Sequence, residues 1–182
     1  LLRDETFTTI DVPSAMDTQA LGINNAGVIV GVYVDVSGYE HGFRYEHSAF
    51  QTIDFPDAVH THAFGINDRG EIVGFYTDGG NRVHGFLLSK GAFATLDFVD
   101  PSTVFTYGFG INAAGMMVGE YLSSAGIAAG WVSTRTGFTG LMVPAAESTI
   151  AIGINASGHI VGHYVDGNQN LRGFLASPAR GR

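Results

Sequence analysis

The chain has 182 residues, of which 45% are hydrophobic, and this is enough for one compact domain with a core. Its net charge is −8, without any run of basic residues, so nucleic acids and anionic membrane surfaces are poor partners. No apolar run approaches the roughly 18 residues of a transmembrane helix. The chain contains no cysteine, which excludes disulfides and thiolate chemistry.

The predicted elements, taken from the N-terminus, are short strands separated by tight turns. A first strand at 7–13 precedes the first full repeat and stands apart from it. That repeat predicts strands at 18–24 and 28–34, the second of them rich in β-branched residues. A third strand begins at 42–45, and a fourth at 50–55 is ended by proline.

This order of strands returns three times, because the pattern Gly-Ile-Asn-x-x-Gly-x-(Ile/Met)-Val-Gly-x-Tyr occurs at 22–33, 65–76, 110–121 and 153–164. Successive copies start 43, 45 and 43 residues apart. Four strands in about 44 residues is the content of one propeller blade. We therefore predict an all-β protein, a four-bladed β-propeller that forms a single domain over 1–182. Its repeat cores begin at residues 18, 61, 106 and 149.

The two ends of the chain predict how the ring closes. The last repeat reaches a third strand at 173–175 and has no fourth. The N-terminal strand at 7–13 matches the fourth strands at 50–56, 93–99 and, loosely, 138–144. We expect it to complete the last blade and so remove an exposed sheet edge. The alternative is that two chains exchange these strands, so the protein is either a monomer or a strand-exchanged dimer.

The repeats resemble the HAF family of bacterial extracellular repeats, whose pattern is His-Ala-Phe, a spacer, and then Ile-Asn-x-x-Gly-x-Val-Val-Gly. Here Gly replaces the middle Ala, and the His is lost in the third and fourth repeats. The resemblance implies a secreted, periplasmic or cell-envelope β-propeller-like protein from a bacterium, and it supplies no catalytic residues. The matching stretches are His41-Gly42-Phe43, His84-Gly85-Phe86, Ala129-Gly130-Trp131 and Arg172-Gly173-Phe174.

The repeats differ mainly in the loops of one face, and function usually lies on variable loops held by a uniform scaffold. We therefore expect a binding mouth near the axis on that face. Glu120 and His163 are the sharpest candidates, because the equivalent Val32 and Phe75 are apolar and a buried charge needs a partner or a task. Comparison of the other variable positions adds the acid–base candidates His62 and Tyr107, and the ligand-binding candidates Asp17, Tyr39, His41, His60, His84, Phe105 and Arg172.

Three functions fit these residues. The first is a binding module for a glycan or small organic ligand. The second is a cofactor-independent lyase, isomerase or hydrolase that works by acid–base chemistry, since no nucleophile motif or phosphate-binding loop is present. The third is a purely structural or protein-interaction ring. A metal held by His60, His62 and His84 is weighed, but we predict no metal and no cofactor, because nearby histidine pairs often occur by chance.

Overall fold

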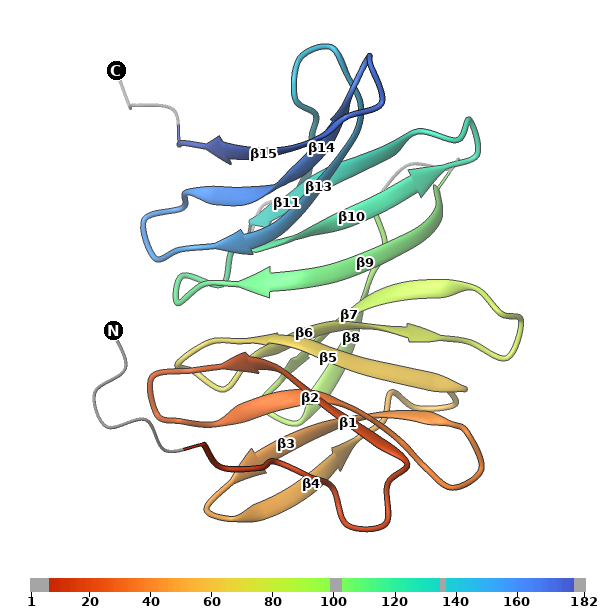
Figure 1. Cartoon of the computed structure of the whole chain (residues 1–182), viewed down its shortest axis with the longest axis vertical. Coiled ribbons are helices and arrows are strands. Elements are labelled where there is room, and N and C mark those ends of the chain that lie inside the picture. Colours follow the sequence, from red (N-terminus) through yellow and green to blue (C-terminus); the bar gives the residue numbers. More distant parts are fainter. Residues whose placement is uncertain (1–6, 99–102, 135–136, 179–182) are drawn as a thin grey trace.

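The computed structural model describes residues 7–98, 103–134 and 137–178, and in these ranges it contains strands and no helix. The described part accordingly has no helix that could cross a membrane. The strands form four antiparallel sheets, one from each repeat, which confirms the all-β class and the repeat organisation. Figure 1 shows the sheets following one another along the longest axis, with the first repeat at one end and the last at the other.

Each sheet is a meander whose strands pair in chain order. The first three sheets have four strands and the last has three. The strands are β1 (Asp17–Ile23), β2 (Ile29–Val34), β3 (Glu40–Glu46), β4 (Ala49–Ile53), β5 (His60–Ile66), β6 (Ile72–Thr77), β7 (Val83–Ser89), β8 (Ala92–Leu96), β9 (Thr103–Ile111), β10 (Met117–Ser123), β11 (Ala128–Thr134), β12 (Gly137–Leu141), β13 (Ala146–Ile154), β14 (Ile160–Asp166) and β15 (Leu171–Ala176).

Glycines in the second strand of each repeat make room for the aromatic core. In each of the first three sheets the glycine lies opposite an aromatic residue of the third strand. A Cβ atom on the glycine would collide with that ring and with a backbone carbonyl, so only glycine fits there. The ring fills the space and is fully buried. The pairs are Gly31 with Phe43, Gly74 with Phe86 and Gly119 with Trp131.

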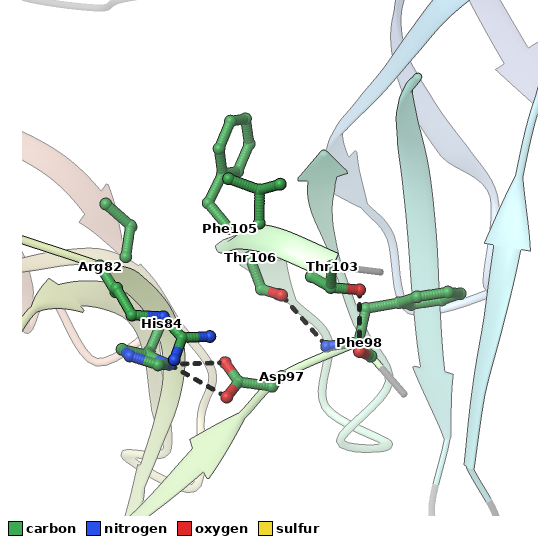
Figure 2. Close-up of a pocket in the computed structure, with 9 residues that line it drawn as sticks. Arg82, His84, Asp97, Phe98, Thr103, Phe105 and Thr106 are labelled. Carbon is green, nitrogen blue, oxygen red and sulfur yellow. Dashed lines mark hydrogen bonds and ion pairs between the residues drawn. The ribbon is translucent and has the colours of Figure 1, made fainter. Parts of the chain in front are cut away.

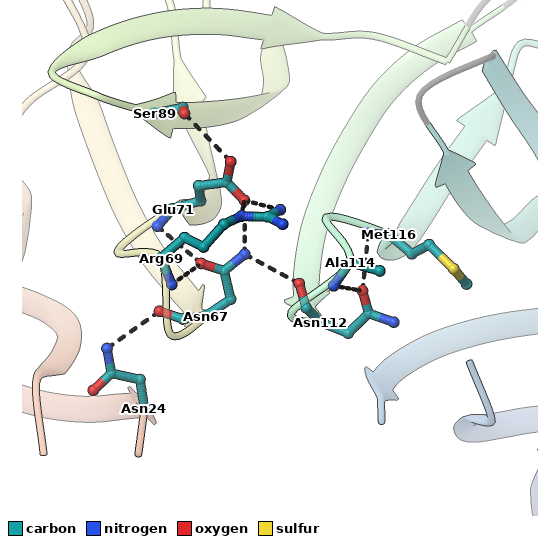
Figure 3. A network of polar contacts seen from close by, with 8 residues as sticks. All are labelled: Asn24, Asn67, Arg69, Glu71, Ser89, Asn112, Ala114 and Met116. Carbon is teal, nitrogen blue, oxygen red and sulfur yellow. Dashed lines mark hydrogen bonds and ion pairs between the residues drawn. The ribbon is translucent and has the colours of Figure 1, made fainter. Parts of the chain in front are cut away.

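Asparagines in the turns between first and second strands connect one sheet to the next (Figure 3). Each side-chain oxygen accepts two backbone N–H groups of its own turn, which is a local role that Asn fulfils well. In the first three sheets the side-chain amide then donates to the backbone carbonyl of the Asn in the following sheet. These ladder bonds are Asn24 to Asn67 at 3.2 Å, Asn67 to Asn112 at 3.0 Å and Asn112 to Asn155 at 3.0 Å.

The expected closing strand at 7–13 is not formed, so the four sheets do not close into a ring in this structure. Residues 7–12 belong to no sheet, Phe7 is 89% exposed, and the last sheet has three strands. The physical reason is the position of the segment. The segment leads directly into β1 of the first sheet, whereas β15 lies at the opposite end of the row (Figure 1). The N–H of Val12 donates to Oγ1 of Thr18 at 3.1 Å, as the equivalent N–H groups do in the other repeats.

Candidate functional site

The first strands of all four sheets line one cavity of about 350 Å³. The residue just before each Gly-Ile-Asn motif points into it, and in every repeat that residue is large and apolar. The four residues are Leu21, Phe64, Phe109 and Ile152. Because they come from β1, β5, β9 and β13, the cavity lies where the first strands of the four sheets come together. We call it the axial cavity.

Two polar side chains enter the axial cavity, Glu120 from β10 and His163 from β14. Burial raises the pKa of Glu120 above its ordinary value, because the carboxylate loses part of its hydration. Tyr107 lies directly opposite Glu120 in the β9–β10 register. Burial, and then the negative charge of Glu120, raise the pKa of Tyr107 as well. The cavity therefore combines apolar walls with a carboxyl group and an imidazole that can exchange protons or hydrogen-bond a ligand.

A second cavity of about 290 Å³ lies between the first and second sheets and shares Leu21 and Phe64 with the axial cavity. Glu40 is its organising residue. The carboxylate of Glu40 lies 2.9 Å from Nε2 of His62 and 3.6 Å from Nδ1 of His60. The backbone N–H of Glu40 also donates to Nδ1 of His60 at 3.2 Å. Both histidines are thus held by one residue on the neighbouring strand β3.

A third cavity of about 240 Å³ lies between the second and third sheets (Figure 2). Arg82, His84 and Asp97 line it from the second sheet's side, and Phe105 lines it from β9. The backbone at its floor is fixed, because the N–H of Phe98 donates to the buried Oγ1 of Thr106 at 3.1 Å. The lining of this cavity is mostly polar, whereas the lining of the axial cavity is mostly apolar. The two cavities have no lining residue in common.

His84 is held between two carboxylates. Its Nδ1 lies 3.0 Å from Asp97, its Nε2 lies 3.3 Å from Asp78, and its ring stacks on Tyr76 at 5.1 Å. A backbone hydrogen bond from Arg82 lowers the pKa of Asp78 most, against burial, and His84 lowers it further. The same arrangement recurs in the first sheet, where His41 lies between Asp35 at 3.5 Å and Asp54 at 2.9 Å. In both sheets the histidine connects a loop to the end of the fourth strand.

The residues predicted from the sequence therefore fall into separate groups. The axial group contains Glu120 and His163, with Tyr107 opposite. The group between the first two sheets contains Asp17 and His62, with His60 bound to Glu40 and with half-exposed Tyr39 whose ring centroid lies 6.1 Å from that of His60. His84 and Phe105 lie in the third cavity, His41 lies in its own carboxylate pair, and Arg172 reaches Asp166 at 3.2 Å on an exposed edge.

Sequence reasoning missed the acidic partners of these residues. Glu40, Asp54 and Asp97 are nowhere among the predicted candidates, although they bind four of the predicted histidines. A signal was present for two of them, because His41 and Asp54 are separated by 13 residues and so are His84 and Asp97. Among the residues that the structure describes, no three His, Asp or Glu side chains are grouped to hold a metal ion.

Four antiparallel sheets in a row, each built from one repeat around a common axial cavity, define a β-propeller-like protein. Among solved structures, the fold is similar to that of AofleA from Arthrobotrys oligospora, solved as a mutant with three arginines replaced by alanine. The TM-score is 0.53 and the identity 13% over 93% of this chain. The chain spans 58% of the length of that protein, and the similarity concerns the fold alone.

A second structure is a mutant of Aleuria aurantia lectin in complex with alpha-methyl-L-fucoside. It matches with a TM-score of 0.40 and 7% identity, over 91% of this chain and 74% of that chain. No family model matches the chain, and no curated protein matches its sequence. The resemblance to HAF repeats therefore stays a prediction.

Proposed function

We propose that the protein is a binding module that holds a glycan or a similar small polyhydroxylated ligand in the axial cavity. The observation that carries this proposal is the lining of the cavity. Ligand sites are concave, mostly apolar and of about 300–1,000 Å³, with a few convergent polar groups. Apolar residues from all four sheets and the polar pair Glu120 and His163 match that description within about 350 Å³.

The chemistry of the lining favours a sugar over a purely apolar ligand. A sugar ring presents C–H groups on its faces and hydroxyl groups around its rim. Phe64 and Phe109 offer apolar aromatic surface for the ring faces. Glu120 accepts or, when protonated, donates hydrogen bonds, and His163 can do both, so that hydroxyl groups find partners at one side.

The proposal includes the scaffold and its location. The four sheets are then four blades of a propeller, the last of which still needs its fourth strand. An extracellular, periplasmic or cell-envelope location is part of the same proposal and is supported by the resemblance to HAF repeats. It can be tested by following the native protein in fractions of the source cells.

Calorimetric titration with a panel of monosaccharides and methyl glycosides, alpha-methyl-L-fucoside among them, tests the proposal. Hydrogen bonds to charged groups contribute about 1.5–3 kcal/mol, so Glu120→Gln and His163→Phe should each weaken binding about 10- to 100-fold. His47→Phe is the matched control, because the His47 side chain is 91% exposed and lines none of the three cavities. The absence of binding across the panel, or equal binding by all variants, would overturn the proposal.

The second candidate is a cofactor-independent enzyme that uses the same cavity. It is favoured by one observation, the raised pKa of Glu120 beside Tyr107. Perturbed acids that meet other titratable groups in a cavity are typical of acid–base catalysis. NMR of each bound ligand over hours separates the two functions. Under the enzyme hypothesis a ligand is converted and Glu120→Gln retains affinity but abolishes turnover, whereas a binding module leaves every ligand intact.

A further inference from the structure

The two ends of the row of sheets are unmatched halves of one repeated interface. Where one sheet packs against the next, the valine that follows the Ile or Met of the second strand is fully buried, as at Val30, Val73 and Val118. The equivalent Val161 in the last sheet is 49% exposed. Gly173 is exposed too, whereas its counterparts in the other sheets are buried. The outer face of the last sheet is therefore shaped for a further sheet.

The asparagine ladder stops at the same place. Asn24, Asn67 and Asn112 each donate a side-chain N–H to the next sheet. Within the described residues, the side-chain amide of Asn155 has no acceptor, although its oxygen still accepts the N–H groups of Ser157 and His159 at 3.0 and 2.9 Å. At the other end of the row, no residue of the described ranges donates such a bond to Asn24 of the first sheet. In this part of the chain, the last sheet therefore has an amide donor, on Asn155, without a ladder acceptor, and the first sheet has a carbonyl acceptor, on Asn24, without a ladder donor.

Residues 7–12 have the side chains with which a fourth strand makes its contacts, but the segment is not paired in a sheet. In the first three sheets the phenylalanine of the fourth strand meets the buried aromatic ring edge-on, with centroids 5.3–5.6 Å apart. In the first two sheets a threonine two residues later binds the repeated tyrosine, Thr52 with Tyr33 at 3.0 Å and Thr95 with Tyr76 at 3.1 Å, whereas the third sheet has a glycine at that position. Phe7 and Thr9 occupy these places in the N-terminal segment. Their counterparts in the last repeat are Phe174 and Tyr164.

Charge supports the same pairing. The first residue after the fourth strand pairs with the basic residue of the third, as Asp54 with His41 and Asp97 with His84. In the third repeat the same two positions are both apolar, Ala129 and Met142, so the positions change together. In the last repeat the basic position is Arg172, and its equivalent partner in the N-terminal segment is Asp11. The two charges are opposite, as the pattern requires.

We infer that residues 7–12 of a second copy of this chain complete the last sheet by pairing with β15. The segment of the same copy leads directly into β1, and the first sheet lies at the far end of the row from β15 (Figure 1). When two copies exchange the segment reciprocally, each last sheet gains a fourth strand and packs against the first sheet of the partner. Because the two copies then form a closed ring of sheets through head-to-tail interfaces, no edge of a last sheet stays unpaired.

The register of this contact can be derived from the first sheet. There Phe43 faces Thr52 and Arg44 faces Gln51. By equivalence, Leu175 of one copy faces Thr8 of the other. Both side chains are exposed, so replacing them does not disturb the core. The chain has no cysteine, so two introduced thiols are the only ones that can react. Opposite residues of an antiparallel pair have Cα atoms about 4.5–5.5 Å apart, which suits a disulfide.

The test mixes Leu175→Cys with Thr8→Cys, refolds them together, oxidises them and separates the products without reductant. We expect a covalent dimer, at twice the 19.2 kDa of the chain, from the mixture and from the double variant, and none from either single variant. Arg44→Cys with Gln51→Cys in one chain is the positive control, which cross-links at monomer mass. Thr8→Cys mixed with Lys90→Cys, an exposed turn residue, is the negative control.

Sedimentation velocity of the unmodified protein completes the test. We expect a dimer, and we expect Phe7→Ala to raise its dissociation constant about tenfold or more, because a buried aromatic anchor is lost. A double variant that cross-links only at monomer mass would show that the segment closes its own chain and would overturn the inference. A monomer in sedimentation with no cross-link between chains would overturn it as well.

Discussion

Removing the side chain of Asn67 should destabilise the protein more than its position in a turn suggests. Asn67 is 4% exposed. Its oxygen accepts the N–H groups of Arg69 and Glu71 at 3.0 and 3.1 Å. Its amide donates to the Glu71 carboxylate at 2.7 Å and to the Asn112 carbonyl at 3.0 Å (Figure 3). Each bond contributes about 1 kcal/mol, so Asn67→Ala should cost about 3–4 kcal/mol.

Asn155 provides a control for this prediction in the monomeric chain, at protein concentrations below the dissociation constant of the inferred dimer. Its oxygen makes the same two turn bonds, but among the described residues its amide makes no ladder bond. The free energy of unfolding lost in Asn67→Ala should therefore exceed that lost in Asn155→Ala by about 2 kcal/mol for the two amide bonds, and the burial of Asn67 adds to this difference because Asn155 is exposed. For a chain of this size, 1 kcal/mol shifts the melting temperature by about 2–4 °C, so the two variants should melt about 4–8 °C apart.

Urea titration followed by tryptophan fluorescence gives the free energies of unfolding, because the single tryptophan, Trp131, is fully buried and reports on the core. Thermal melting by circular dichroism checks the order of the two variants. If both variants lose the same stability, neither the amide bond to Glu71 nor the ladder bond to Asn112 contributes, and the ladder is a by-product of the turns. An Asn155→Ala variant less stable than Asn67→Ala would refute the reasoning as well.

Three further predictions concern packing and pH. Gly85→Ala places a Cβ 2.6 Å from the Leu96 carbonyl and should cost about 1–3 kcal/mol in urea titration, whereas Gly79→Ala in an open loop should stay within about 0.5 kcal/mol. The raised pKa of Glu120 gives a stabilising contribution below its ordinary value of 4.5 that is lost as pH rises. Glu120→Gln should therefore melt like the parent at pH 4 and above it at pH 7; a lower melting point at pH 7 would contradict this. Burial opposes ionisation of Glu71, but hydrogen bonds from Arg69 and Asn67 lower its pKa, so its contribution exists above 4.5 and is lost as pH falls. Glu71→Gln should lower the melting point at pH 7 and converge with the parent near pH 3, and parallel melting curves at both pH values would refute it.

The strands and sheets could be predicted because their signals are local. Alternation, turn residues and the spacing of Gly-Ile-Asn motifs specify each meander without reference to distant parts of the chain. The closing strand at 7–13 was predicted by the same similarity, and it is not formed. Similarity to a fourth strand shows what the segment can pair with, but pairing also needs a free edge within reach. In one copy that edge, β15, lies at the other end of the row.

The site was predicted in part, for a comparable reason. Comparison of equivalent positions found Glu120 and His163, because a polar residue replaces an apolar one and the inner strands of all repeats face one cavity. The same comparison could not tell that His62 faces a different cavity. Its partner Glu40 comes from the neighbouring sheet, and contacts between sheets depend on how repeats pack, which single positions do not encode.

Pairs of positions carry more of that information than single positions do. The histidine of the third strand has one acidic partner six residues before it and another 13 residues after it in the first two repeats. The third repeat has lost all three charges together, with Ser123, Ala129 and Met142 in their places. The residue at this position is Ala where its partners are uncharged, and His or Arg where they are acidic, so its identity follows from its contacts. By that reasoning Arg172, whose preceding partner Asp166 is present at 3.2 Å, still requires an acidic residue at the end of a fourth strand.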